Sequence, residues 1–258
     1  MKKHAHQRRP PESYRKRTYR GVAEESGFCS SSVKIRETDL HILAEFDVST
    51  KAYELAAQFR LQVERYIDVS PEFATSLTPL SDNNLAPPII RAMLAAGMCA
   101  DVGPMAAVAG AIAEFVCRGL IDEGCNEVIV ENGGDIYLQR SSDCTIAVFA
   151  GQSPLSNRVG LKLAADEMPA GICTSSGTVG HSLSLGVADS VTVLADSAVL
   201  ADAAATRIGN EVGNYKEPRD GVNRALEAAE EINGIRGVLV ICAELLGASG
   251  RVELVPLD

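Results

Sequence analysis

A weak internal repeat runs through the chain from residue 103 onward. Each copy predicts an alanine-rich helix followed by two strands that a glycine-containing turn connects. The first copy places its helix over 105–120 and its strands over 127–131 and 136–140. The second copy places helices over 200–208 and 221–232, strands over 237–243 and 251–255, and a turn over 247–250. Because each unit must bury one apolar face, the duplication predicts an α+β domain in which helices cover one face of antiparallel sheets.

The first hundred residues predict a hairpin followed by helices. Alternating apolar residues over 28–36 and 40–47 indicate two strands, and residues 71–88 are rich in turn formers and predict a surface loop or a cover over a cleft. A short helix is expected over 89–97. Between the hairpin and the loop, residues 51–69 predict an amphipathic helix. Its apolar face comprises Leu55, Phe59, Val63 and Tyr66.

Composition limits the class of protein. With 258 residues, of which 46% are hydrophobic, the chain can bury a full core without disulfides. Its seven cysteines are scattered and include no Cys-x-x-Cys pair, which is typical of reduced thiols in a cytoplasmic protein. Only His41 and His181 lie beyond residue 20, which disfavours a multi-histidine metal centre. No stretch of about 18 residues is wholly apolar, so we expect no membrane span.

Charge is distributed unevenly along the chain. Residues 1–20 contain eight Lys and Arg against the single acidic residue Glu12, a net charge of +7, so the remainder carries −17 to give the total of −10. We therefore expect a flexible basic tail over 1–20 and a single domain over 21–258, with an RNA or membrane contact as the alternative for the tail. Because an acidic body repels phosphate backbones, nucleic acid is not an expected partner.

Residues 171–210 combine a Ser- and Gly-rich segment, a strand and a helix expected to open with Asp202. Asp202 and Thr206 are four residues apart and therefore share one face of that helix. Carboxylate and hydroxyl oxygens are ligands that Mg²⁺ accepts, so the pair predicts a metal site beside a nucleotide. An alternative is that Asp202 only caps its helix by accepting backbone N–H groups. Asp196 either completes the site or occupies a turn.

Two further segments place glycine where a ligand could approach the backbone. Gly103-Pro104-Met105 reads as a helix start, whose free N–H groups and dipole favour a phosphate, although a plain Gly-Pro helix start explains the residues equally well. Asn132-Gly133-Gly134-Asp135 predicts a tight hairpin in which adjacent glycines adopt positive φ. There the Asn132 and Asp135 side chains are candidates for hydrogen bonds to a base or ribose.

The segment Thr174-Ser175-Ser176-Gly177 offers hydroxyl and backbone N–H groups to phosphate oxygens, with a polar surface turn as the alternative. His181 follows four residues later and is a candidate general acid or base, or a pyrophosphate contact. The alternative for His181 is an ordinary surface residue. Together these segments indicate a small anionic ligand or nucleotide.

Three of these motifs, in this order, resemble those of the ApbE-type flavin transferases, the FAD:protein FMN transferases. Asn132 to Ile136 is similar to the Asn-x-Gly-Gly-Asp-Ile segment of that family, Thr174 to Gly177 to its Thr/Ser-Ser-Gly turn, and Asp202 to Thr206 to its closing Asp-x-x-x-Thr. A closer likeness is to an uncharacterised branch of the superfamily, which shares the Gly-Pro-Met-Ala-Ala start at 103–107 and the pair Tyr19-Arg20.

The resemblance implies a T-fold-like arrangement of tandem β/α units and a site that binds FAD and Mg²⁺. It implies metal ligation by Asp202 and Thr206, catalytic roles for Asp202 and His181, and transfer of FMN to a Ser or Thr hydroxyl of an acceptor protein. Relatives with this fold associate through sheets or helices, which implies a homodimer. No membrane partner is implied.

The chain departs from the flavin transferases at two places. They carry Lys-Gly where this chain has Val102-Gly103, and a His-rich segment ending in Asp-Pro where this chain runs from Ser182 directly toward a strand. These differences favour an alternative in which the protein binds a ligand or assists another protein without transferring FMN. A third hypothesis is a role in sulfide assimilation or sulfur handling, which would require reactive thiols at Cys29 or Cys173.

Overall fold

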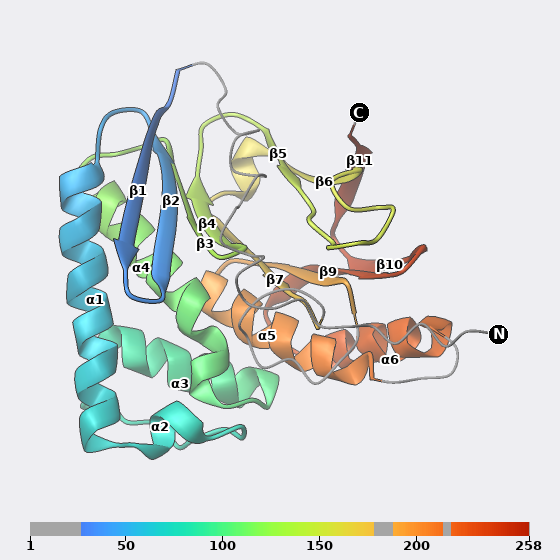
Figure 1. Ribbon diagram of the computed structural model, residues 1–258, viewed down its shortest axis with the longest axis horizontal. Coiled ribbons are helices and arrows are strands. Elements are labelled where there is room, and N and C mark those ends of the chain that lie inside the picture. Colours follow the sequence, from blue (N-terminus) through green and yellow to red (C-terminus); the bar gives the residue numbers. More distant parts are fainter. Residues whose placement is uncertain (1–26, 178–187, 214–217, 258) are drawn as a thin grey trace.

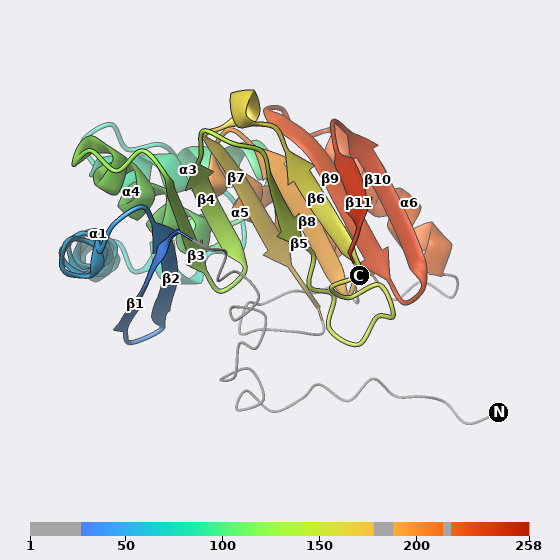
Figure 2. The same ribbon diagram turned by 90° about the horizontal axis from the view of Figure 1, so that it is seen from above.

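The computed structural model describes residues 27–177, 188–213 and 218–257. The predicted tail over 1–20, the pair Tyr19-Arg20 and His181 lie outside the described residues. Within them, an eight-stranded antiparallel sheet forms the centre of the molecule, in the order β1-β2-β3-β4-β7-β8-β9-β10 (Figures 1 and 2). In that order its strands span Cys29–Ile35, Thr38–Ala44, Val128–Asn132, Asp135–Gln139, Ala170–Ser175, Ser190–Ala195, Ile235–Cys242 and Leu245–Gly250.

Helices cover one face of this sheet, and a second sheet lies against the other, as Figure 2 shows. The helices are α1 (Ser49–Val69), α2 (Glu72–Thr75), α3 (Pro88–Ala100), α4 (Val108–Asp122), α5 (Ala198–Glu211) and α6 (Pro218–Glu230), with 3₁₀ turns η3 (Pro104–Ala107) and η4 (Ala165–Glu167). The second sheet has three antiparallel strands, β5 (Cys144–Ala147), β6 (Val159–Leu163) and β11 (Glu253–Pro256), in the order β11-β6-β5. The predicted α+β class, with antiparallel sheets covered by helices, is confirmed.

Strand alternation divides the core into two main layers. Side chains such as Leu40, Val130 and Val193 point toward the helices and join the larger cluster of buried residues. Alternate residues such as Leu138 and Ile172 point the other way and pack with residues of β6 between the two sheets. The inner strands of the central sheet therefore bury apolar residues on both faces, whereas the edge strands β1 and β10 are largely exposed.

Small residues allow α5 to lie very close to its neighbours. A Cβ at Gly110 would lie 2.3 Å from the backbone oxygen of Ala198, and one at Gly171 would lie 2.3 Å from the Ala198 nitrogen. The first turn of α5 is thus held between α4 and β7. The expectation that alanine-rich helices pack tightly over the sheet is confirmed, because Ala201, Ala203, Ala204 and Ala205 are fully buried.

Two details of the second repeat were predicted wrongly. Residues 247–250 belong to strand β10, and the hairpin turn lies at Ala243 and Glu244, where Ala243 has φ 55°. Gly247 serves close packing instead, since a Cβ there would lie 2.5 Å from Val222 of α6. The final strand, β11, leaves the central sheet and pairs with β6. The repeated unit is therefore a helix followed by a hairpin, β3–β4 in one copy and β9–β10 in the other.

One described stretch, Pro104–Asp122, is long and apolar enough to cross a membrane by length and composition alone. This stretch comprises η3 and α4, and its window is 56% buried inside the protein. It packs against α1, α5 and the central sheet. Its apolar character is accounted for by its position in the core.

A buried carboxylate joins α4 to the start of α5. Glu114 accepts hydrogen bonds from the Ser197 hydroxyl (2.8 Å) and the Val199 backbone N–H (3.2 Å) through Oε2. Its other oxygen lies 2.7 Å from a guanidinium nitrogen of Arg118, one turn further along α4. The Glu114 side chain is only 5% exposed, so the two donors of α5 have little access to water as a substitute.

We predict that Glu114→Ala destabilises the protein by about 2–3 kcal/mol, because it leaves two donors at the start of α5 without their acceptor. Chemical denaturation followed by circular dichroism measures this change. Glu227→Ala provides the control, since Glu227 forms an exposed i,i+3 pair on α6 and its loss should hardly move the midpoint. Equal effects of the two substitutions would contradict the assignment of Glu114 as the link.

Candidate functional site

Asp202 lies in the second turn of α5, so the expectation that it opens its helix was wrong. The helix starts at Ala198, and its N-cap is Ser197, whose side chain accepts a hydrogen bond from Leu200 N (3.4 Å). Asp202 instead accepts a hydrogen bond from the Gly110 backbone N–H through Oδ2 (2.9 Å). Gly110 is in the first turn of α4, where N–H groups have no partner within their own helix. Asp202 therefore caps a neighbouring helix.

One peptide group of α4 is held from two directions. Its N–H, on Gly110, donates to Asp202, and its carbonyl, on Ala109, accepts from Asn132 Nδ2 at 3.1 Å. Asn132 is the last residue of β3 and is buried. The Ala109–Gly110 peptide thus fixes the distance between α5 and the end of β3, and it brings two of the sequence-predicted motifs together.

Asp135 begins β4 directly opposite Asn132 in the hairpin. It is buried, and its Oδ1 accepts a hydrogen bond from Thr174 N (3.3 Å). Burial raises the pKa of Asp135 well above its usual range, and the negative charge of Asp202 raises it further. Burial also raises the pKa of Asp202, against the opposing effect of the Gly110 and Ala109 N–H groups. The two carboxyl groups therefore lie close enough for the charge of Asp202 to disfavour the ionisation of Asp135.

No described Lys, Arg or His forms an ion pair with either of these carboxyl groups. Burying like charges without a counter-charge is costly unless a cation joins them or a proton is taken up. Within the described residues, no group of three or more His, Cys, Asp and Glu is arranged to hold a metal ion. A cation here would thus depend on the Asp202 and Asp135 oxygens, the Thr206 hydroxyl, main-chain carbonyls and the ligand itself. Oxygen ligands of this kind fit Mg²⁺.

The Asn132-Gly133-Gly134-Asp135 segment is a two-residue hairpin, as predicted. Gly133 has φ 73° and Gly134 φ 110°, values that other residues rarely adopt. A feature that the sequence did not reveal is that the Glu131 side chain accepts a hydrogen bond from Gly134 N (2.8 Å). This hydrogen bond ties the turn directly before Asp135 back to β3.

Thr174 and Ser175 are the last residues of β7, so the expectation of a four-residue turn was wrong for these two. Strand alternation sends their side chains to opposite faces. The Thr174 hydroxyl lies 3.0 Å from the Thr192 hydroxyl on the side of the second sheet. Ser175 shares the helix-covered face with Cys173. The chain bends only afterwards, where Gly177 N donates to the Ala188 carbonyl (3.0 Å).

Gly103-Pro104-Met105 begins a helical turn, as predicted, but η3 is a four-residue 3₁₀ turn. A Cβ at Gly103 would lie 1.8 Å from the Ser76 carbonyl oxygen. The absence of a side chain at Gly103 is therefore explained by contact with the segment after α2. At the start of α4, the Gly110 N–H already donates to Asp202 and is therefore not available to a phosphate.

Cys173, one of the two thiols that the sulfur-handling hypothesis would require, is buried beside the carboxyl pair. It lies opposite Val193 in the sheet, and its thiol donates to the Ala198 carbonyl (3.3 Å). Burial, followed by the charges of Asp135 and Asp202, raises the pKa of the Cys173 thiol well above its usual range. Such a thiol is a weak nucleophile at neutral pH.

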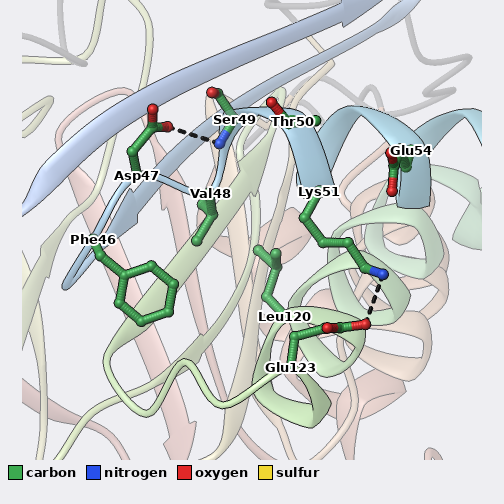
Figure 3. A pocket seen from close by; sticks show the side chains of 9 residues that line it. All are labelled: Phe46, Asp47, Val48, Ser49, Thr50, Lys51, Glu54, Leu120 and Glu123. Carbon is green, nitrogen blue, oxygen red and sulfur yellow. Dashed lines mark hydrogen bonds and ion pairs between the residues drawn. The ribbon is translucent and has the colours of Figure 1, made fainter.

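A surface pocket of about 370 Å³ lies elsewhere, between the start of α1 and the end of α4 (Figure 3). Phe46, Val48 and Leu120 contribute apolar atoms, and the Lys51–Glu123 ion pair (2.6 Å) crosses it. Leu120 is ten residues beyond Gly110, about 15 Å along the helix. None of the sequence-predicted site residues lines this pocket, and the buried carboxyl pair therefore defines the candidate site.

The family model described as AbpE bacteria matches residues 21–254. The chain belongs to this family. A UPF0280 protein of Methanococcus maripaludis is 46% identical over 239 residues, which cover 90% of this chain and 94% of that protein. The UPF0280 protein of Methanocaldococcus jannaschii is 44% identical over 211 residues, covering 81% and 85%.

Solved structures of two ApbE proteins share the fold. A mutant of the flavin transferase ApbE from Vibrio cholerae matches with a TM-score of 0.57 and 14% identity, covering 86% of this chain and 96% of that one. The apo flavinyl transferase ApbE from Pseudomonas stutzeri matches with a TM-score of 0.55 and 13% identity, covering 86% and 93%. The predicted resemblance to the ApbE-like superfamily and its fold is confirmed.

We predict that Asp135→Asn stabilises the ligand-free protein at pH 8 by about 1–2 kcal/mol, because it removes a buried charge while keeping an acceptor for Thr174 N. A carboxyl group whose pKa is raised on folding costs stability as the pH rises above its unfolded value near 4. The difference between variant and wild type should therefore shrink as the pH falls from 8 to 5, toward that unfolded value. Urea denaturation at both pH values measures it.

Asp68→Asn, at an exposed position of α1, controls for general charge effects. A stability difference for Asp135→Asn that is the same at pH 5 and pH 8 would show that the Asp135 carboxyl does not ionise at a cost in the folded protein.

Proposed function

We propose that the protein binds a flavin dinucleotide together with Mg²⁺ at the Asp135–Asp202 pair and transfers FMN from FAD to a hydroxyl group of an acceptor protein. The observation that carries the proposal is a pair of neighbouring acidic side chains for which the described residues supply no basic partner. Membership of an ApbE-like family and the fold of two flavin transferases support flavin as the ligand.

In this proposal the side chains have separate roles. Asp202 and Thr206 hold Mg²⁺, which when bound neutralises charge on the FAD diphosphate. Asp135 accepts the proton of the acceptor hydroxyl, since a raised pKa suits a general base near neutral pH. The acceptor oxygen forms a bond to the flavin-side phosphorus, the anhydride P–O bond breaks, and AMP leaves. The Asn132–Ala109 hydrogen bond keeps the first turn of α4 in position beside Asp202.

A second candidate function is ligand binding without transfer. It is favoured by the pair Val102-Gly103, which has no lysine at the place where the flavin transferases carry Lys-Gly. Without that cation, the site would bind a nucleotide but stabilise the departing AMP less. The sulfur-handling hypothesis is less well supported, because the raised pKa of Cys173 opposes thiolate formation.

The test is a thermal-shift titration with FAD, FMN and ADP, each with and without Mg²⁺. At about 100 times its Kd a ligand stabilises by about 2.7 kcal/mol, which for a protein of this size raises Tm by about 5–10 °C. We expect FAD to produce this shift only with Mg²⁺, and Asp202→Asn to abolish it. The amide oxygen of Asn can still accept from Gly110 N, so the variant should fold.

Asp68→Asn is again the matched control and should respond to FAD as wild type does. Transfer itself is measured as AMP released in the presence of a Ser- or Thr-containing acceptor protein. An Mg²⁺-dependent FAD shift without AMP release would favour the binding function. A shift in Asp202→Asn equal to that of wild type would reject the assignment of Asp202.

A further inference from the structure

Among the residues that the structure describes, the Ser175 hydroxyl has no hydrogen-bond partner. Its residue is 7% exposed, and among the described residues its Oγ is the buried side-chain oxygen or nitrogen for which no partner is found. Burying a hydroxyl without a partner costs free energy, and native proteins rarely keep one without a reason. The sequence alone gives no reason to choose Ser175 over Thr174 or Ser176 as the ligand contact.

The orientation of Ser175 places it on the same side of the sheet as the carboxyl pair. Cys173 and Ser175 are two residues apart on β7 and therefore share a face, and Cys173 belongs to the buried cluster beneath the helices. Asp135 acts electrostatically on Cys173, and its carboxyl accepts from Thr174 N. Ser175 thus lies two residues beyond Cys173, the neighbour of Asp135, toward the end of β7.

Helix α5 runs over β7 in the same direction. Gly171 lies beneath Ala198, and the charge of Asp202 acts on Cys173. Two residues of strand advance about 6.7 Å, and four residues of helix advance about 6 Å. The distance along β7 from Cys173 to Ser175 is therefore about equal to the distance along α5 from Asp202 to Thr206. From this correspondence we infer that the Ser175 hydroxyl faces the half-buried turn of α5 that carries Thr206.

We infer that the Ser175 hydroxyl is a contact for a diphosphate oxygen of an Mg²⁺-bound nucleotide, and that it is left unpartnered until this ligand arrives. The inference rests on the proposed function, of which it specifies the ligand group and a residue that selects it. A hydroxyl donates to an anionic oxygen, whereas the adjacent carboxylates repel one unless a cation accompanies it. The carboxylates would therefore favour a diphosphate that arrives with its metal over a free anion, and Ser175 would donate to one of its oxygens.

The variant Ser175→Ala distinguishes a ligand contact from a structural role, because a ligand contact predicts a higher Tm without ligand and a higher Kd for the nucleotide. Without ligand, Ala should raise Tm by about 2 °C, because it removes an unsatisfied buried hydroxyl. With Mg²⁺ and either FAD or ADP, the Kd of the variant should rise about tenfold, equivalent to 1.4 kcal/mol. Differential scanning fluorimetry gives the first value and isothermal titration calorimetry the second.

Ser190→Ala is the matched control. Ser190 begins the adjacent strand β8, is fully buried, and its hydroxyl lies 3.3 Å from that of Thr192. Its loss should lower the Tm of the ligand-free protein and leave the Kd unchanged. A Ser175→Ala variant that is destabilised without ligand overturns the inference, since the hydroxyl would then have a structural partner.

Nucleotide binding by wild type and by Ser175→Ala separates the role of Ser175 from the proposed function. If wild type binds Mg²⁺–FAD and Mg²⁺–ADP and Ser175→Ala binds both equally well, the inference is wrong and the proposed function stands. If wild type binds neither nucleotide at millimolar concentration, the proposed function fails and the inference fails with it. A tenfold loss for Ser175→Ala, combined with its higher Tm, supports both.

Discussion

The hydrogen bond from the Gly110 N–H to the Asp202 carboxylate connects the parts of this molecule on which the candidate site depends. It joins α4 to α5, and the same peptide group reaches β3 through Asn132. The bond requires Gly110, because a side chain there would collide with α5. It also occupies one carboxylate oxygen, Oδ2, and keeps Asp202 beside Asp135. A structural cap and a potential ligand group are therefore the same residue.

The alternatives of helix cap and metal ligand for Asp202 are consequently not exclusive. The sequence suggested that a cap would serve the helix that contains Asp202, whereas the structure assigns that role to Ser197 and gives Asp202 to the neighbouring helix. A carboxylate held by backbone N–H groups keeps a fixed orientation, and fixed orientation is what a binding site needs from its ligands. The backbone hydrogen bonds lower the pKa of Asp202 and burial raises it, and because burial has the larger effect the pKa stays raised.

The sequence predicted the fold class and most elements because the hydrophobic pattern and the turn chemistry agreed. The Asn132-Gly133-Gly134-Asp135 hairpin was predictable, since its glycines need positive φ. Gly247 was misread because a glycine that permits close helix packing has the same sequence appearance as a glycine in a turn. The pairing of Asp135 with Asp202 and the role of Gly110 involve contacts between residues 67 or more positions apart, which local patterns do not encode. Ser175 could be distinguished from Thr174 only once β7 was known to be a strand there, because alternation then places the two side chains on opposite faces of the sheet.

The two polar contacts between α4 and α5 also have a consequence for how the chain can vary in length. Gly110 bonds to Asp202 and Glu114 to Ser197 and Val199, so the contacts are one turn apart on each helix and run in opposite directions. One residue inserted between Gly110 and Glu114 would rotate the latter by about 100° and separate one of these pairs. This single turn of α4 therefore cannot gain or lose a position without breaking one of these contacts.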